Sequence, residues 1–62
     1  MKPGDLVRMR ARSIESVYGT GLVVKRVLDQ EGFLLGLRVF WSKYGLGNRV
    51  NPHSLELISE GR

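Results

Sequence analysis

The stretch FLLGLRVFW, residues 33–41, decides the fold class that this sequence predicts. Its odd positions from Leu35 to Trp41 are all apolar, and its even positions include a glycine and an arginine. A repeat of two is typical of a β-strand that turns one face to the core and the other to solvent. We therefore predict a strand whose core-facing side chains are Leu35, Leu37, Val39 and Trp41.

Two strands are predicted on the N-terminal side of this stretch. In residues 6–12, LVRMRAR, apolar side chains alternate with arginines, which indicates a strand with one solvated face. Residues 13–20 show no clear repeat and are expected to form a loop. Residues 21–28, GLVVKRVL, are rich in β-branched side chains and predict the second strand. Because its LVV run is apolar at successive positions, either both faces are covered or a bulge shifts the register.

The C-terminal side predicts a hairpin bend and a short fourth strand. Residues 42–48, SKYGLGN, contain Gly45, Gly47 and Asn48, which favour a bend. Residues 48–50 then predict the short strand.

A single helical turn and a fifth strand are predicted to follow. Asn51 is able to cap a 3₁₀ turn over residues 51–54, and Pro52 suits its first position because the missing N–H is not needed there. Residues 55–58, LELI, predict the last strand. Residues 59–62, SEGR, are polar and are expected to fray.

The composition bounds the kind of protein. The chain has 62 residues, so we expect one domain over residues 1–62. It has no cysteine, and no apolar run approaches the roughly 18 residues of a membrane helix. The N-terminus lacks the apolar segment of a signal peptide, so we expect a soluble intracellular protein. A formal charge of +4 favours acidic partners.

The predicted strands are too short and too few to form a flat sheet with buried faces. We therefore predict an all-β fold in which five strands curl into a small barrel, with the 3₁₀ turn before the last strand. A chain of this size buries only about 60% of its unfolded surface. Its stability is expected to be on the order of a few kcal/mol unless self-association adds to the core.

The order of the motifs resembles that of the SH3-like barrels. GDLVR (residues 4–8) opens the first strand, GTGLVV (19–24) leads into the second, and VFW (39–41) precedes VNPHSLELI (50–58). The chain looks most like small stand-alone SH3-like proteins of unknown function that phages encode and environmental sequences contain. The resemblance implies a non-enzymatic binding or assembly module without a cofactor. It would act in the host cytoplasm or the virion, with a protein partner or a second copy of itself.

Two related families extend the resemblance. The KOW-type barrels of transcription and ribosomal proteins share the basic first strand and the glycine before the second, which implies RNA or protein as a partner. The type II dihydrofolate reductases share the GD-x-V-R start and the L-E-x-I end. Their active pore is lined by a Val-Gln-Ile-Tyr segment before the proline, where this chain has Asn-Arg-Val-Asn at residues 48–51. A reductase is therefore the third hypothesis, after assembly and nucleic-acid binding.

Three arginines are expected on one face of the first strand, namely Arg8, Arg10 and Arg12. Alternate residues of a strand lie ~6.6–6.8 Å apart, which is close to the spacing of phosphates along an extended single strand. Such a row either tracks a nucleic-acid backbone or keeps the strand face solvated. Nucleic-acid binding through this row is the alternative function.

Aromatic residues gather near the ends of the predicted strands. Tyr18, Phe33, Trp41 and Tyr44 either contribute to a groove that docks a peptide or stacks bases, or pack in the core and on loops. By its parity Phe40 faces away from the core, so it is either an exposed interface residue or covered by a bulge or loop. The candidate partner-binding residues are Tyr18, Phe40, Trp41, Lys43, Tyr44 and Arg49.

No catalytic, cofactor-binding or metal-binding residue is predicted. His53 is the only histidine, and it has no cysteine or second histidine with which to bind zinc. Asp5 and Glu56 are carboxylates suited in principle to acid–base chemistry, but the sequence pairs neither with a nucleophile. Gly19 and Gly21 are explained by a turn, because no Lys-Ser or Lys-Thr and no predicted helix follow them.

Overall fold

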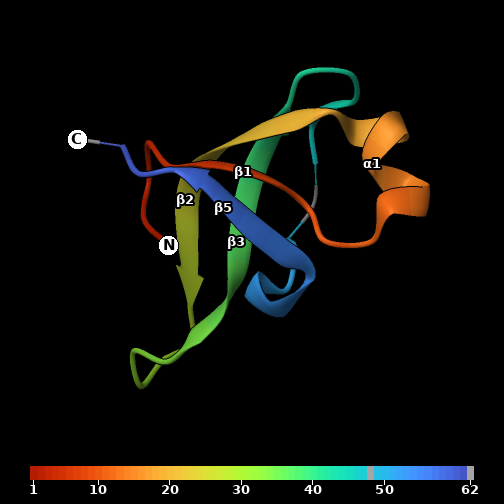
Figure 1. Ribbon diagram of the computed structural model, residues 1–62. Helices are drawn as coiled ribbons and strands as arrows, with labels where there is room; N and C mark the ends of the chain where they lie inside the picture. Colours follow the sequence, from red (N-terminus) through yellow and green to blue (C-terminus); the bar gives the residue numbers. More distant parts are fainter. Residues whose placement is uncertain (48, 62) are drawn as a thin grey trace.

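The chain forms one five-stranded antiparallel sheet with a short helix and a 3₁₀ turn (Figure 1). The computed structural model describes residues 1–47 and 49–61. The sheet order is β4-β3-β2-β1-β5. The prediction of an all-β chain with a 3₁₀ turn before the last strand is confirmed. The elements are β1 (Leu6–Met9), α1 (Arg12–Tyr18), β2 (Thr20–Leu28), β3 (Leu34–Trp41), β4 (Gly45–Leu46), the 3₁₀ turn η1 (Pro52–Ser54) and β5 (Leu55–Ser59).

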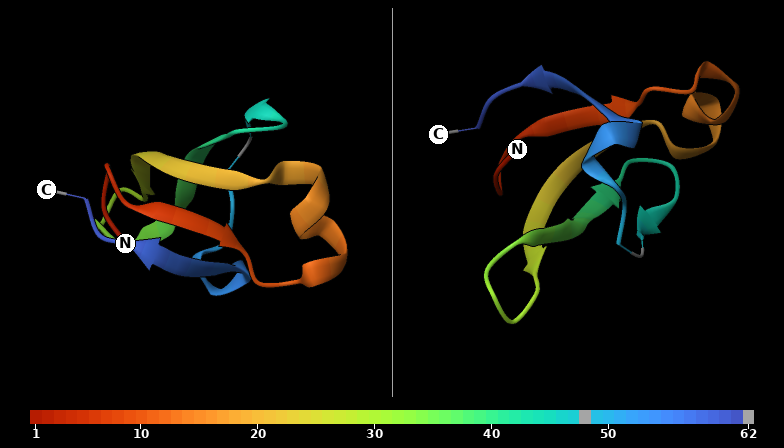
Figure 2. Two further views of the ribbon diagram at one scale, coloured as in Figure 1. Left: turned by 45° about the horizontal axis from the view of Figure 1, so that its top comes forward. Right: turned by 90° about the horizontal axis from the view of Figure 1, so that it is seen from below.

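The strands bend around one small core (Figure 2). Its buried side chains come from β1, β2, β3 and β5, and the half-buried Tyr18 and Val50 pack against them. Gly21 makes room for the largest of these side chains, because a Cβ there would lie 2.7 Å from the Trp41 ring. The buried apolar residues are Val7, Met9, Val23, Leu37, Val39, Trp41 and Leu55.

The predicted core row of β3 is confirmed at three positions and wrong at Leu35. Leu35 is 46% exposed, whereas Leu37, Val39 and Trp41 are buried. The register of β2 and β3 shifts near the end of their hairpin, where the paired residues step from Gly36 to Leu34. Leu35 is therefore the extra residue of a bulge near the end of the β2–β3 hairpin. This hairpin extends away from the rest of the sheet (Figure 1).

A second bulge lies in the middle of β2. The partners of Val23 and Lys25 are consecutive residues of β3, so Val24 has no partner there. Of the two explanations for the apolar LVV run, the bulge is therefore the one observed. Val24 itself is 42% exposed.

The expectation of a loop over residues 13–20 is wrong, because α1 occupies most of that segment. Ile14, Val17 and Tyr18 have the i, i+3, i+4 spacing of a helix face, which is the sequence signal for a helix in this segment. A helix of one or two turns is unstable alone, so tertiary contacts must hold it. Lys43 supplies two of these contacts. Its backbone N–H donates to the Tyr18 carbonyl at 3.1 Å and its Nζ to the Ser16 carbonyl at 3.2 Å.

The first strand is shorter than residues 6–12, and its early end also corrects the expected row of arginines. The chain bends after Met9, and Arg12 is already the first residue of α1. The Arg10 backbone N–H donates to the Ser54 carbonyl at 2.8 Å. That bond holds the chain at the end of β1 beside the start of β5. The predicted strand would instead have continued to Arg12 without a bend.

The fourth strand also lies earlier than predicted. β4 consists of Gly45 and Leu46, which pair with Trp41 and Phe40, so the bend falls within residues 42–44. Of the expected strand over residues 48–50, only Val50 takes part in β pairing among the described residues, through an isolated bridge to Leu37. Asn48, expected in the bend, lies outside the described residues.

The predicted 3₁₀ turn and last strand are both confirmed. The Asn51 side chain caps η1, since its Oδ1 accepts a hydrogen bond from the His53 backbone N–H at 2.9 Å. β5 then pairs with β1 over its whole length, apart from a register shift between Leu6 and Val7. No helix within residues 1–47 and 49–61 is long and apolar enough to cross a membrane.

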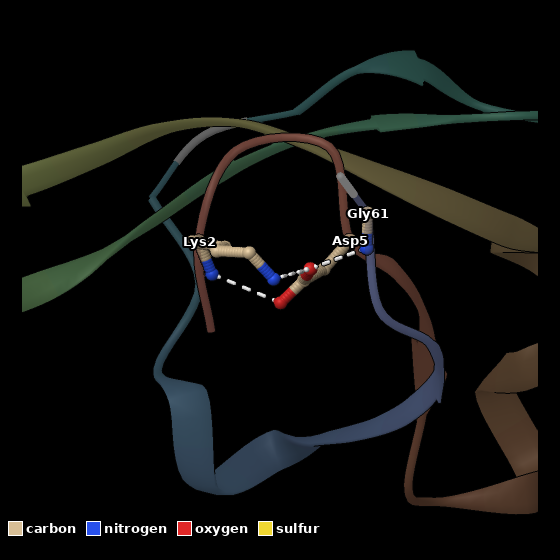
Figure 3. A network of polar contacts seen from close by, with 3 residues as sticks. All are labelled: Lys2, Asp5 and Gly61. Carbon is tan, nitrogen blue, oxygen red and sulfur yellow. Dashed lines mark hydrogen bonds and ion pairs between the residues drawn. The ribbon is translucent and has the colours of Figure 1, made fainter.

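The C-terminal segment is held against the N-terminal turn rather than frayed (Figure 3). The Gly61 backbone N–H donates to Oδ1 of the buried Asp5 at 2.8 Å. Lys2 donates to the same carboxylate through its backbone N–H and through Nζ, each at 3.0 Å. These donors, the Gly61 N–H first, lower the pKa of Asp5 from 3.8 to about 2. Arg62, also expected to fray, lies outside the described residues.

Candidate interaction surfaces

The outer face of the sheet carries a continuous row of apolar side chains. Leu6 on β1 lies opposite Leu22 on β2, Leu22 lies opposite Phe40 on β3, and Phe40 lies opposite Leu46 on β4. Side chains of directly opposed residues share one face of a sheet and stand close together. We call Leu6, Leu22, Phe40 and Leu46 the apolar row.

All four members of the apolar row are exposed. The exposed fraction rises along the row from 38% for Leu6 to 56% for Leu46, and Phe40 is 52% exposed. Of the two alternatives for Phe40, the exposed one is therefore observed. The other three members are not predicted from the sequence, where the apolar LVV run of β2 has only two explanations, namely two covered faces or a bulge.

Polar residues border the apolar row on both sides. On one side, Arg8 of β1 lies opposite Thr20 of β2 and Glu56 of β5. On the other side, Arg38 of β3 lies directly opposite Lys25 of β2. Two like charges at opposed positions repel each other. An apolar strip with polar borders resembles the apolar core and polar rim of a protein interface.

Three of the predicted partner-binding aromatics form a cluster at one end of the core. The ring centre of Tyr18, at the end of α1, lies 5.2 Å from that of Trp41 and 5.1 Å from that of Tyr44. Both pairs are tilted, which is a favourable arrangement for aromatic rings. Trp41 is buried and serves the core, whereas Tyr44 is 60% exposed. Phe33 does not join the cluster, because it lies in the exposed β2–β3 hairpin.

The aromatic cluster lines a cavity of about 350 Å³. Arg49 also borders this cavity, so four of the six predicted partner-binding residues meet there. Lys43 borders a different cavity, and Phe40 lies on the outer face in the apolar row. The predicted set is therefore divided among three surfaces. Phe40 and Trp41 lie on opposite faces of β3, and the turn after β3 places Lys43 and Tyr44 at two different cavities.

The three arginines of the expected row have three different environments. Arg8 stays on β1, with its Nε 3.7 Å from Oε1 of Glu56. Arg10 donates from Nε to the His53 carbonyl and from Nη2 to the Leu55 carbonyl, both at 3.1 Å. Arg12 lies on α1 and is exposed. One strand face therefore does not present all three guanidinium groups to a nucleic acid.

The residues considered for acid–base or metal chemistry are separated in the structure. Asp5 accepts hydrogen bonds from both ends of the chain, and Glu56 lies beside Arg8. His53 lies exposed in η1. Within the described part of the chain, no three His, Cys, Asp or Glu side chains group closely enough to hold a metal ion.

A comparison of the chain with protein-family models, with curated proteins and with solved structures finds no match.

Proposed function

We propose that this protein is a non-enzymatic assembly module with an SH3-like barrel fold, and that it binds a second copy of itself through the apolar row. The observation that carries the proposal is the unbroken line of four exposed apolar side chains across β1, β2, β3 and β4. Exposed apolar patches bordered by polar residues are typical of protein interaction sites.

The barrel assignment is supported by contacts that connect the far parts of the sheet. Val50 bridges to Leu37 of β3, with its N–H and carbonyl both hydrogen bonded at 2.8 and 2.9 Å. From Val50 the chain passes through η1 into β5, which pairs with β1 at the other side of the sheet. This path brings the chain from the β3 side to the β1 side around the core, as closure of a small barrel requires.

The partner is proposed to be a second copy because the core of one chain is small. Only seven apolar side chains are buried, whereas the exposed large apolar residues in the described segments number fifteen. A domain of about 60 residues is marginally stable, and oligomerisation is a common way to enlarge its core. A two-fold axis through the apolar row would pack the row against itself, because such an interface uses the same patch on both subunits.

The test is light scattering over a range of protein concentrations, comparing the wild-type chain with Phe40→Ser. Burying the exposed half of Phe40 in both copies is worth about 2–3 kcal/mol, so the substitution is expected to weaken self-association by about 30- to 150-fold. Phe33→Ser is the matched control, because Phe33 is also exposed but lies outside the row. A wild-type chain that stays monomeric at high concentration, or equal effects of both substitutions, would refute the proposal.

Salt provides a second readout. Two copies of a chain with a formal charge of +4 repel each other, and the Arg38–Lys25 pair places part of that charge beside the row. Added sodium chloride screens this repulsion, so self-association is expected to strengthen between low and physiological ionic strength. Weakening by salt would show that ionic contacts, and not the apolar row, hold the oligomer together.

A further inference from the structure

A cavity of about 570 Å³ collects basic side chains from three separate parts of the chain. Arg8 comes from β1, Arg12 from α1 and Lys43 from the turn after β3. Glu15 is the one carboxylate among the residues that line it, so the lining carries an excess of two positive charges (three cations and one anion). This grouping differs from the row predicted from the sequence, because Lys43 takes part and Arg10 does not.

Gly19 is one of the residues that line this cavity. Its φ of 75° is unfavourable for other residues, and a Cβ at this position would lie 3.1 Å from Cγ of Lys43. The missing side chain therefore lets the Lys43 stem and Ser42 approach the end of α1. Ser42 Oγ accepts a hydrogen bond from the Thr20 backbone N–H at 3.0 Å, which leaves its O–H proton to donate.

Arg8 borders the cavity, while its Nε lies beside Glu56. Its Nε is buried and has no hydrogen-bond partner among the described residues. The Glu56 carboxylate is its ion-pair partner, but 3.7 Å is too long for a hydrogen bond. The Arg8 side chain as a whole is 43% exposed, so its guanidinium group offers a charge interaction to an acceptor oxygen in the cavity.

We infer that this cavity binds a phosphate group. Guanidinium groups match the tetrahedral oxygens of phosphate with paired hydrogen bonds, while a lysine ammonium acts as a point charge. The cavity is open to solvent on one side, which leaves room for a phosphate attached to a larger group. Ile58 supplies an apolar wall for that group. The phosphate belongs either to a free nucleotide or to the backbone of a single-stranded nucleic acid.

The direct test is a nuclear magnetic resonance titration with inorganic phosphate at constant ionic strength, with sodium chloride as the reference salt. The side-chain N–H signals of Arg8 and Arg12 are expected to shift in a saturable way, because guanidinium groups that border the cavity gain an acceptor. Arg12→Gln and Lys43→Gln are each expected to weaken binding by about tenfold, the usual effect of losing one charged hydrogen bond. Arg38→Gln removes the same charge outside the cavity and is expected to change the affinity less than about twofold.

Three results would overturn the inference. One is the absence of a saturable shift at the side-chain N–H groups of Arg8 and Arg12. Another is an equal loss of affinity in Arg12→Gln, Lys43→Gln and Arg38→Gln, which would show only a response to net charge. The titration is repeated with Phe40→Ser, because the cavity borders the apolar row. Phe40→Ser is expected to bind phosphate with the same affinity as the wild-type chain. Phosphate binding by the self-associated wild-type chain alone would also refute a site within one chain.

The same titration distinguishes the two sources of the phosphate. A nucleoside 5′-monophosphate that binds at least as tightly as a short single-stranded oligonucleotide supports the site and assigns it to a free phosphorylated ligand. Tighter binding of the oligonucleotide supports the site and assigns it to a nucleic-acid backbone. In that case the logarithm of the affinity is expected to fall with the logarithm of the salt concentration, with a slope of about −1.4 to −2.1 for two or three phosphates.

Discussion

Trp41 and Phe40 are neighbours on β3, yet they lie on opposite faces of the sheet in very different surroundings. Trp41 is 1% exposed, and Phe40 is 52% exposed. The two side chains are similar in chemistry, so their burial depends on what covers each face of the strand. The inner face is covered by the other strands and by the chain around η1, whereas the outer face is left to solvent or to a partner.

The two faces also differ in how closely their side chains are fitted. On the inner face, Gly21 opposes Trp41, and a Cβ there would collide with the indole ring. On the outer face, Leu22 opposes Phe40, and both side chains stay partly open to solvent. A close-packed interior tolerates little change in volume, so inner-face substitutions should affect folding and outer-face substitutions should affect association.

The largest expected effect comes from replacing Trp41 with alanine. Removing a buried tryptophan costs about 3–5 kcal/mol, which is comparable to the whole stability expected for a chain of this size. Trp41→Ala is therefore expected to be partly unfolded even before urea is added. Far-ultraviolet circular dichroism, recorded from zero urea upward, measures the unfolded fraction.

Phe40→Ala is the comparison for this experiment, at a protein concentration low enough to avoid self-association. Its free energy of unfolding is expected to fall by only about 1 kcal/mol, because half of the ring is already exposed. Similar losses of unfolding free energy for Trp41→Ala and Phe40→Ala would mean that the two faces of the sheet contribute equally to folding.

A smaller effect is expected from two arginines that the sequence placed in one row. Arg10 donates two side-chain hydrogen bonds to the carbonyls of His53 and Leu55, whereas Arg12 is exposed. Arg10→Gln is expected to lower the free energy of unfolding by about 1–2 kcal/mol. Arg12→Gln, with the same change in charge, is expected to change it by less than about 0.5 kcal/mol. Urea denaturation of both variants measures the difference, and a reversed order would contradict the assigned role of Arg10.

Near neutral pH, a small change in pH is expected to leave the contribution of Asp5 to stability unchanged, because this carboxylate is already ionised there. Its pKa is lowered from 3.8 to about 2, so its contribution to stability is complete above pH 3.8 and is lost as the pH falls toward 2. Urea denaturation of the wild-type chain and Asp5→Asn at several pH values measures this contribution. The stability difference between the two is expected to shrink below pH 3.8, and a constant difference down to pH 2 would rule out this role.

The sequence predicted those parts of the fold that depend on local patterns. The alternation in β3 identified Leu37, Val39 and Trp41 as core residues, and Asn51 with Pro52 identified η1. It failed where pairing between strands mattered. Leu35 continues the same alternation, but a shift of register in the hairpin leaves it outside the core.

The candidate sites were harder to predict than the strands. Phe40 was recognised as facing outward, but Leu6, Leu22 and Leu46 join it only through the register of four strands. Arg8, Arg10 and Arg12 have the spacing of a strand face, and a bend after Met9 separates them. Lys43 lies far from Arg8 and Arg12 in sequence and borders the same cavity because its turn packs against α1.

By itself, the sequence determined the strand-rich character of the chain and the inward or outward direction of side chains within most of β3. These properties follow from the geometry of single strands, in which successive side chains alternate between faces. Only the tertiary structure decided which outward residues stand side by side and which charged groups share a cavity. Those relations depend on register, bulges and the folding of α1 against the turn after β3, which join residues that are distant in the sequence.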